Sequence, residues 1–356
     1  MSPSVIINVN LADRSYPIVI GNGLLDDSFD ISSYMAGPDC LVVSNVTVAP
    51  LYLDRLSRCL GGRNMRSVVL PDGEAHKTLA IASTVLDSLV AMRAARDASV
   101  IALGGGVVGD IAGFAAACYM RGIGFIQVPT TLLAQVDSSV GGKTGVNHPE
   151  GKNLIGAFHQ PRVVVIDTTT LQTLPGRELR AGLAEVIKHG AIADIAFFGW
   201  LEEYMSKLLE RDGEALAYAI RRSCEIKAAM VAADEREAGQ RALLNFGHTF
   251  AHAIENSLGY GEWLHGEAVA AGMVMAARLS DIDSRDVDRL RRLIEAAGLP
   301  TEPPRVGGNQ LRAAMNLDKK AQDGKLRFVL LQALGRAVVT AEYDAPRLVD
   351  ILSQAA

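Results

Sequence analysis

The sequence predicts a protein of the α/β class, with an N-terminal α/β domain built on a parallel sheet and a mostly α-helical C-terminal domain. In the first half, short apolar runs rich in Val, Ile and Leu alternate with helical segments. Such strands, hydrophobic on both faces, are typical of a parallel sheet covered by helices. In the second half, apolar residues recur with the 3.6-residue period of helices. The length of 356 residues suits two domains, each large enough to bury a core.

The elements follow in order along the chain. Alternating residues at 4–9 and 16–20 predict a short opening hairpin. Buried strands are predicted at 40–44, 66–70, 99–103, 124–128 and 162–166, with helices at 79–94 and 110–119. Leu174-Pro175-Gly176 marks the boundary between domains 1–175 and 176–356. Beyond it we expect helices at 178–189, 195–209, 213–234, 249–258, 267–279 and 284–297, and a late hairpin at 327–331 and 337–340. A ligand site is expected in the cleft between the domains.

Composition excludes several classes of protein. Hydrophobic residues make up 49% of the chain, too many for a disordered protein. The net charge of −5 argues against broad binding to nucleic acid or to an anionic membrane. The four cysteines are far apart and form no C-x-x-C motif, which favours free thiols in a reducing compartment. The N-terminus has no signal-peptide pattern, and no apolar run is long enough to span a bilayer, so we expect a cytoplasmic protein.

A glycine-rich turn follows the strand predicted at 99–103. Gly104, Gly106 and Gly109 match G-x-G-x-x-G, and Asp110 is placed to cap the helix that follows. Glycines here let a pyrophosphate approach the backbone at a helix N-terminus. The dinucleotide fingerprint also expects an acidic residue after the next strand, but Gln127-Val128-Pro129-Thr130-Thr131 contains none. The motif therefore fits either a Rossmann-like dinucleotide site without the usual ribose contact or a turn that packs tightly.

Three of the seven histidines lie within 18 residues. His248 and His252 have the i,i+4 spacing that places two imidazoles on one helix face, and His265 is close in sequence. Together with a carboxylate, three such ligands and an open position describe a catalytic zinc site. The spacing nominates both members of the pair as ligands. The alternative is a pair of core or surface histidines without metal.

Cationic residues stand in two segments that we predict to be loops, 137–145 and 150–153. Neither matches the P-loop, because Asp137 stands where that motif requires glycine, and this disfavours hydrolysis of nucleoside triphosphates. Lys188 follows Glu185 by three residues, as in a surface ion pair or a shared site. The run Asp318-Lys319-Lys320 alone is typical of a solvated loop.

Taken in order, these segments resemble the 3-dehydroquinate synthase family, and the resemblance covers nearly the whole chain. It rests on an ordered set of motifs: PDGEAHKT (71–78), GGGVVGD (104–110), QVPTTLLAQVDSSVGGKTGVN (127–147), GKNLIGAFHQP (151–161), AGLAEVIKHG (181–190), LNFGHTFAHAIE (244–255), HGEAVAAGM (265–273) and DKK (318–320).

The resemblance implies a metal site and an NAD site. The metal, zinc or cobalt, would be bound by Glu185, His248 and His265, with His252 contacting substrate instead. Residues 1–175 would be the NAD-binding domain, and residues 176–356 would bind metal and substrate. The implied NAD contacts are Asn45, Asp72, Gly73, Glu74, Ala75, His76, Lys77, Gly106, Val107, Val108, Gly109, Asp110, Thr130, Thr131, Lys143, Lys152, Thr170, Leu171, Gln172 and Thr173. Glu74 and Lys77 would replace the missing ribose-binding acid.

The resemblance also implies the substrate and the oligomer. The residues expected at the substrate are Asp137, Lys143, Lys152, Asn153, Lys188, Lys227, Arg241, Asn245, His252 and either Lys319 or Lys320. Arg121 matches an arginine that the family donates across a subunit interface, which implies a homodimer. The family substrate, 3-deoxy-D-arabino-heptulosonate 7-phosphate, carries a carboxylate and a phosphate, and clustered cations would attract it.

The implied reaction forms a carbocycle without net oxidation. NAD takes a hydride from C5 of the substrate, phosphate is eliminated, and the hydride is returned. Ring opening and an intramolecular aldol step then give 3-dehydroquinate, while zinc holds the C4 and C5 hydroxyls.

Four alternatives remain open. Other sugar phosphate cyclases share the metal and NAD motifs, although this chain has the dehydroquinate-type residue at Arg241, Asn245 and His252. A homologue acting on an aminated substrate would differ little in its pocket. A metal- and NAD-dependent polyol dehydrogenase would not need the clustered cations. A non-catalytic homologue would not need all three metal ligands.

Overall fold

The computed structural model describes residues 4–237, 239–259, 261–321 and 326–354, and the side chains of residues 27–28 and 316–321 lie outside that description. The chain forms two compact units. The first comprises the residues up to Leu174 together with Leu216–Arg236, and the second comprises Pro175–Ala215 and the residues from Glu237 onward. Among the described residues, no helix combines the length and apolar character that crossing a membrane requires.

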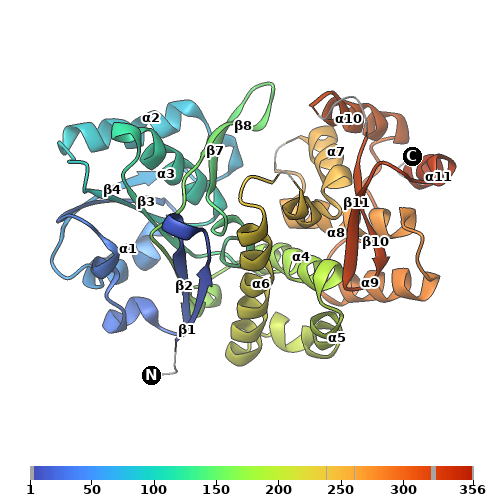
Figure 1. Ribbon diagram of the computed structural model, residues 1–356, viewed down its shortest axis with the longest axis horizontal. Helices are drawn as coiled ribbons and strands as arrows, with labels where there is room; N and C mark the ends of the chain where they lie inside the picture. Colours follow the sequence, from blue (N-terminus) through green and yellow to red (C-terminus); the bar gives the residue numbers. More distant parts are fainter. Residues whose placement is uncertain (1–3, 238, 260, 322–325, 355–356) are drawn as a thin grey trace. The chain divides into compact units, whose positions relative to one another are not determined.

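The first unit is built on a seven-stranded sheet with strand order β1-β2-β9-β6-β5-β3-β4 (Figure 1). Its strands are β1 (Val5–Val9), β2 (Tyr16–Gly21), β3 (Asp39–Asn45), β4 (Asn64–Leu70), β5 (Ser99–Gly104), β6 (Gly124–Pro129) and β9 (Val163–Asp167). Only the β1–β2 pair is antiparallel, and the remaining pairs of this sheet are parallel. The predicted opening hairpin and parallel strands are thus confirmed. The strand predicted at 66–70 is parallel as expected but not buried, because β4 lies at the edge of the sheet and only Leu70 of it is buried.

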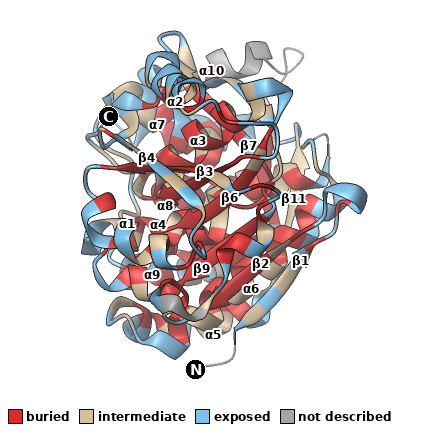
Figure 2. Cartoon of the chain, turned by 90° about the vertical axis from the view of Figure 1, so that its left-hand side faces the viewer, coloured by how far each residue is buried: buried red, intermediate tan, exposed pale blue. Residues whose placement is uncertain are grey.

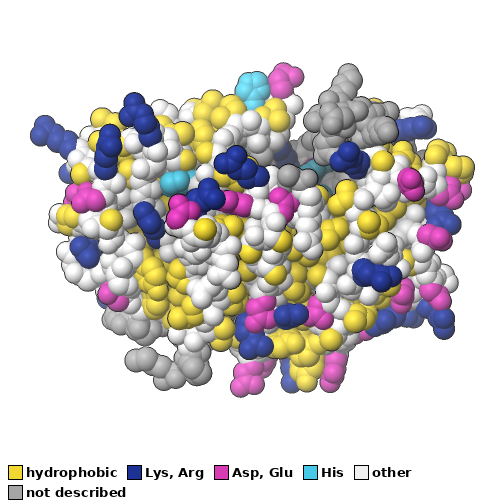
Figure 3. Space-filling model, in the orientation of Figure 1, with side chains coloured by type: hydrophobic (Ala, Val, Ile, Leu, Met, Phe, Trp, Pro, Cys, Tyr) yellow, Lys and Arg dark blue, Asp and Glu magenta, His cyan; other side chains and the backbone are white. Residues whose placement is uncertain are grey.

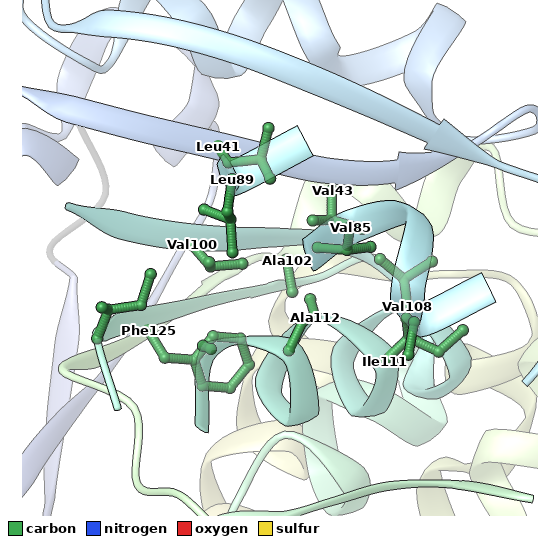
Figure 4. Close-up of a cluster of buried hydrophobic side chains, with 14 of the residues drawn as sticks. Leu41, Val43, Val85, Leu89, Val100, Ala102, Val108, Ile111, Ala112 and Phe125 are labelled. Atoms are coloured by element: carbon green, nitrogen blue, oxygen red, sulfur yellow. The ribbon is translucent and has the colours of Figure 1, made fainter. Parts of the chain in front are cut away.

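Helices cover both faces of this sheet. On one face, α2 (Leu79–Ala91) and α3 (Gly106–Cys118) pack in a core to which β3 contributes Leu41 and Val43 (Figure 4). On the other face, α1 (Ala49–Arg58) packs in a core to which β3 contributes Cys40 and Val42. Successive residues of a strand point to opposite faces, so an apolar run buries both. Figure 2 shows the buried strands β3, β6 and β9 in red.

A separate hairpin, β7 (Lys143–His148) with β8 (Gly151–Phe158), corrects one prediction. We expected the cationic segments at 137–145 and 150–153 to be loops, but Lys143 and Lys152 lie on its strands. Glycines allow the two backbones to pair closely here, because a Cβ on Gly145 would lie 2.6 Å from the carbonyl oxygen of Ile155. Because glycine has a low β-propensity, the sequence pattern did not indicate strands here.

The second unit is mostly helical, as predicted. It contains α4 (Gly176–Ala193), α5 (Ile195–Leu209), α7 (His248–Leu258), α8 (His265–Leu279), α9 (Ser284–Ala296), α10 (Gly308–Ala321) and α11 (Ala345–Ser353), and the hairpin β10 (Phe328–Ala333) with β11 (Arg336–Thr340). Helix α8 packs against both α4 and α7. The Asp318-Lys319-Lys320 run lies in α10 rather than in a loop.

The helix α6 (Gly213–Ala233) belongs mainly to the first unit, although the predicted division placed it in the second domain. Three contacts explain this. The Nζ atom of Lys227 bonds to Asp137, and the thiol of Cys224 donates to the carbonyl oxygen of Gln135 at 3.3 Å. Just beyond the helix, Glu235 pairs with Arg14 at 2.9 Å.

Charged side chains of both signs are interspersed on the surface in Figure 3. This mixture agrees with the small net charge of −5. Among the described residues, four further cationic side chains, Lys77, Lys188, Lys227 and Arg241, are buried.

Candidate active site

Three side chains of the second unit converge on one point. Glu185 comes from the middle of α4, His248 is the first residue of α7, and His265 is the first residue of α8. One ligand atom from each lies within 4.8 Å of the others. The Oε1 atom of Glu185 lies 3.8 Å from Nε2 of His248 and 3.7 Å from Nε2 of His265. Two imidazoles and a carboxylate are a ligand set typical of catalytic zinc.

The carboxylate of Glu185 fits a bound cation. Its side chain is 1% exposed, and its Oε2 atom forms an ion pair with Lys188. Its Oε1 atom, which faces both histidines, receives no hydrogen bond. A buried charged oxygen without a donor is costly, and a metal ion between it and the two imidazoles would remove that cost.

Close packing sets where α8 begins. Gly266 lies against the backbone of Ala181 in α4, and a Cβ at this position would overlap the carbonyl oxygen of Ala181. The Oε2 atom of Glu267 accepts a hydrogen bond from the backbone N–H of Leu264 at 2.8 Å, which caps the helix. Arg177 at the start of α4 binds the same carboxylate through two nitrogens, at 2.7 and 2.8 Å. These contacts place His265 opposite Glu185.

The electrostatic surroundings of His265 favour its protonated form in the metal-free chain. Burial alone would lower its pKa, but a hydrogen bond to Glu255 and the charges of Glu255 and Glu185 outweigh burial. The pKa of His265 is therefore raised above its ordinary value of 6.5. A metal ion would have to displace this proton.

His252 does not join the metal group, contrary to the interpretation drawn from its i,i+4 spacing. Its ring centroid lies 5.6 Å from that of His248 and 6.4 Å from that of His265, and its side chain is exposed. The i,i+4 spacing puts His248 and His252 on one face of α7. The two residues that join His248 in the metal group, Glu185 and His265, come instead from the helices α4 and α8. His252 is left beside the metal group.

The glycine turn joins β5 to α3 in the first unit, as predicted. Gly105 is the N-cap of α3, and no side chain caps the helix. Asp110 lies inside the helix, so the predicted cap was wrong, because the helix begins earlier, at Gly106. The turn also packs tightly: a Cβ on Gly106 would lie 2.9 Å from Oγ of Ser138. Free backbone N–H groups at this helix end suit an anionic group.

Predicted NAD contacts of the first unit form a hydrogen-bonded network. Lys77 is 4% exposed, and its Nζ atom lies 2.5 Å from Oδ2 of Asp110 and 2.6 Å from Oδ1 of Asn153. Burial raises the pKa of Asp110, although the charge of Lys77 opposes this. Asn45 donates to Asp72 at 2.7 Å. Lys77, Asp110 and Asn153 thus form one group, and Asn45 and Asp72 form a second pair.

A second buried pair joins α6 to the short helical segment Ala134–Ser138, which follows β6. Lys227 is 5% exposed, and its Nζ atom lies 2.6 Å from Oδ1 of Asp137. The same nitrogen donates to the backbone oxygen of Asp137 at 2.5 Å. Nearby, Thr130 and Thr170 are buried, and Gln135 donates to Oγ1 of Thr170 at 3.0 Å.

The remaining predicted residues differ in their exposure. In the second unit, Arg241 is 2% exposed and Asn245 donates to Glu237 at 2.7 Å. In the first unit, Lys143 is exposed, and so is Arg121, whose φ of +67° is unusual outside glycine. The side chains of Lys319 and Lys320 lie outside the described residues.

Sequence reasoning missed four residues that build the metal group: Arg177, Glu255, Gly266 and Glu267. One signal was available, since Glu267 stands three residues after the N-cap Leu264, the position from which Glu caps a helix. Arg177 and Gly266 act through contacts between helices, which no spacing within one helix reveals.

The chain is similar to known proteins along almost its whole length. The family models for the 3-dehydroquinate synthase N-terminal and C-terminal regions match residues 67–181 and 182–321. The 3-dehydroquinate synthase of Teredinibacter turnerae is 59% identical over 352 residues, which is 97% of this chain and 98% of that one. The corresponding protein of Nitrosococcus oceani is 57% identical over 349 residues, 97% of each chain.

Solved structures with the same architecture include two cyclases. ValA, a 2-epi-5-epi-valiolone synthase from Streptomyces hygroscopicus with NAD+ and Zn2+ bound, has a TM-score of 0.89 at 30% identity over 96% of this chain and 97% of that one. A 2-deoxy-scyllo-inosose synthase complexed with carbaglucose-6-phosphate, NAD+ and Co2+ has a TM-score of 0.84 at 26% identity, covering 98% and 99%. A glycerol dehydrogenase from Schizosaccharomyces pombe, at 17% identity with a TM-score of 0.67 over 95% and 88%, shares the fold alone. With both family models matched and relatives this similar along almost its whole length, the chain belongs to the 3-dehydroquinate synthase family.

Proposed function

We propose that this protein converts 3-deoxy-D-arabino-heptulosonate 7-phosphate to 3-dehydroquinate and phosphate, using NAD and one zinc or cobalt ion per subunit. The observation that carries the proposal is the group Glu185, His248 and His265, present in a chain that is 59% identical to a 3-dehydroquinate synthase. Three ligands of this kind leave a coordination position for substrate. The enzyme would be a lyase of the shikimate pathway, with no net redox change.

Bound NAD would supply reversible oxidation of one substrate carbon, and a metal ion would make a substrate hydroxyl more acidic. The residues proposed to hold NAD are those of the network around Lys77, the N-terminal turn of α3, and the threonines Thr130, Thr131, Thr170 and Thr173. The uncapped N–H groups that follow Gly105 support the pyrophosphate assignment.

The chain's own cations would bind the two anionic groups of the substrate. Lys188, Lys227 and Arg241 are 1%, 5% and 2% exposed, and charges in such surroundings interact more strongly than they do in water. Lys227 and Lys188 are already paired with Asp137 and Glu185, so their ammonium groups are held in place before substrate arrives. The full set of proposed substrate contacts is Asp137, Lys143, Lys152, Asn153, Lys188, Lys227, Arg241, Asn245, His252 and one of Lys319 and Lys320.

We also propose a cytoplasmic homodimer whose subunits exchange Arg121, acting on a small molecule rather than on nucleic acid or membrane. The exposed position of Arg121 and its left-handed backbone support a role at a surface. Sedimentation of the wild type and of Arg121→Ala would test this part. A wild-type chain that sediments as a monomer would contradict it.

The activity is tested by measuring phosphate release from the heptulosonate phosphate with NAD and zinc, while NADH absorbance is followed in the same sample. We expect phosphate and dehydroquinate in equal amounts and no accumulated NADH. Accumulated NADH with glycerol, and no phosphate from the heptulosonate, would indicate a dehydrogenase instead. Phosphate release only from sedoheptulose 7-phosphate or glucose 6-phosphate would indicate another cyclase.

The Arg241→Ala variant then tests the substrate assignment. Because Arg241 is not among the metal ligands, we expect weaker substrate binding or turnover with unchanged zinc content. Loss of zinc from this variant would contradict the assignment.

A further inference from the structure

We propose that Glu255 is a positioning residue of the metal centre, and that it holds His265 in the tautomer that presents Nε2 to the metal. The inference rests on the proposed metal site but not on the reaction catalysed there. It assigns a role to a carboxylate that ends the motif at 244–255 and for which the sequence predicted no role.

The two ring nitrogens of His265 face two different carboxylates. Nε2 lies 3.7 Å from Oε1 of Glu185, inside the group of three ligands, whereas Nδ1 lies 3.4 Å from Oε1 of Glu255. An ionised carboxylate can only accept a hydrogen bond, so Nδ1 must carry the hydrogen. In the neutral imidazole this leaves the lone pair on Nε2, the atom that faces the other ligands.

Glu255 reaches this position because of its place on α7. It follows His248 by seven residues and His252 by three, so all three side chains lie along one stripe of the helix. The first residue of the stripe supplies a metal ligand. The last one meets His265, which begins the neighbouring helix α8.

Because Glu255 is buried, its contact with His265 affects the stability of its charged form. The side chain of Glu255 is 8% exposed, and a carboxylate so far removed from water requires hydrogen-bond donors. The hydrogen on Nδ1 of His265 is one such donor. The pairing therefore restrains the imidazole ring and partly compensates the buried charge.

The other histidine ligand is oriented in a different way. Nδ1 of His248 lies 3.3 Å from the backbone carbonyl oxygen of Phe246. A carbonyl is neutral, whereas Glu255 also brings a negative charge to the far side of the His265 ring. Such a charge makes the imidazole a stronger metal ligand. Of the two orienting contacts, only the one to His265 can be removed by changing a side chain.

Glu255 is better explained as a partner of His265 than as a fourth ligand. It approaches Nδ1, while Nε2, on the other side of the ring, faces Glu185. Among the described residues, the group that could hold a metal is Glu185, His248 and His265, without Glu255.

The test is the zinc affinity of purified full-length protein, measured by competition with a chromophoric chelator in the absence of NAD and substrate. Removing a carboxylate partner of a ligating histidine typically costs about 10–100-fold in metal affinity. We expect Glu255→Met to lose affinity within this range and Glu255→Gln, which keeps an accepting oxygen, to lose less. Unchanged affinity in Glu255→Met, or equal losses in both variants, would overturn the proposal.

A matched control removes a carboxylate that lies elsewhere in the same unit. Glu202 on α5 binds Arg289 on α9 at 2.7 Å, so Glu202→Gln removes an ion pair without touching the metal group. We expect its zinc affinity to equal that of the wild type. A loss in Glu202→Gln as large as in Glu255→Met would show a general effect of instability and overturn the proposal.

A structure of the zinc-loaded wild type tests the same point without any substitution, should the variants not fold. Zinc on Nε2 of His265 with Nδ1 bonded to Glu255 supports the proposal. Zinc on Nδ1, or directly on Glu255, overturns it. A wild type that binds zinc through Nε2 but forms no dehydroquinate would contradict the proposed function alone.

Discussion

The Glu185 side chain is 1% exposed, and burying a carboxylate costs on the order of several kcal/mol unless a cation compensates it. Lys188 compensates one oxygen, one turn along the same helix. The other oxygen faces two imidazole nitrogens at 3.7 and 3.8 Å. At the scale of single residues, the second oxygen of Glu185 therefore calls for a positive charge, which protonated His265 or a bound metal ion would supply.

The two histidines on α7 should behave differently when each is replaced by alanine. His248→Ala removes a member of the metal group, so zinc content and activity should fall together. His252→Ala should keep its zinc, because His252 is not a member of that group, and lose activity through substrate contact. Zinc content by atomic absorption, paired with the phosphate-release assay, distinguishes the two. Zinc loss in His252→Ala equal to that in His248→Ala would contradict this division.

The start of α8 packs directly against the backbone of α4. A Cβ at Gly266 would overlap the carbonyl oxygen of Ala181, an atom of the α4 backbone that cannot move alone. Gly199, in α5, has no atom within 4 Å of the position that a Cβ would occupy. The same substitution therefore has opposite consequences in the two helices.

Gly266→Ala should destabilise the fold by about 1–3 kcal/mol and weaken zinc binding, because His265 is displaced with the start of α8. Gly199→Ala should stabilise the fold by about 0.5–1 kcal/mol, because alanine is the better helix former. Urea unfolding of both variants and the wild type, followed by zinc titration, tests this. A Gly266→Ala variant with wild-type zinc affinity would show that α8 can shift without moving His265.

His159, which follows the last residue of β8, forms a hydrogen bond beside the start of β6 in the sheet. Nε2–H of His159 donates to the carbonyl oxygen of Ile123 at 2.8 Å, and its ring stacks on Phe125. Burial lowers the pKa of His159 below its ordinary value of 6.5, and the nearby charge of Arg162 acts in the same direction, although the hydrogen bond opposes it. The folded chain thus binds this proton less readily than the unfolded chain.

This lowered pKa makes part of the stability depend on pH. The contribution of His159 to the stability is fully present above about pH 6.5 and is lost as pH falls through its lowered pKa. The reason is that the unfolded chain binds the proton at a higher pH than the folded chain does. The free energy of unfolding in urea should therefore fall less steeply between pH 7.5 and 5 in His159→Gln than in the wild type. His148→Gln, at an exposed histidine of the same hairpin, serves as the control. Equal slopes in His159→Gln and the wild type would contradict the assignment.

At the scale of the whole molecule, the reactivity of the four cysteine thiols distinguishes the folded chain from the unfolded chain. Burial raises the pKa of Cys40 to about 11 and that of Cys224 to about 12, and Cys59 is 4% exposed. Cys118 is exposed. The thiolate is the form that reacts, so three of the four thiols are protected in the folded chain.

A disulfide reagent at pH 8 should therefore modify one thiol per native chain rapidly and all four after unfolding in guanidinium. The Cys118→Ser variant should lose the fast reaction. Rapid modification of two or more thiols in the native wild type would show that one of the buried cores opens readily.

The sequence predicted most of the first unit, because buried parallel strands leave a strong local signal. The runs at 40–44, 99–103 and 124–128 became β3, β5 and β6 almost unchanged. The hairpin β7–β8 was not predicted, because its strands pair through glycines and carry polar residues. Local composition identifies a strand most readily when the strand is rich in β-branched and aromatic residues, which these glycine-containing strands are not.

By itself, the sequence determined the α/β class, the helical character of the second half, the glycine turn and the resemblance that singles out Glu185, His248 and His265. Only the tertiary structure decided that α6 belongs mainly with the sheet, that Asp110 pairs with Lys77 instead of capping α3, and that Glu255 meets the far side of the His265 ring. The physical reason is the range of the interactions. Periodicity and spacing act within one helix or strand, whereas these contacts join residues brought together only by packing between elements.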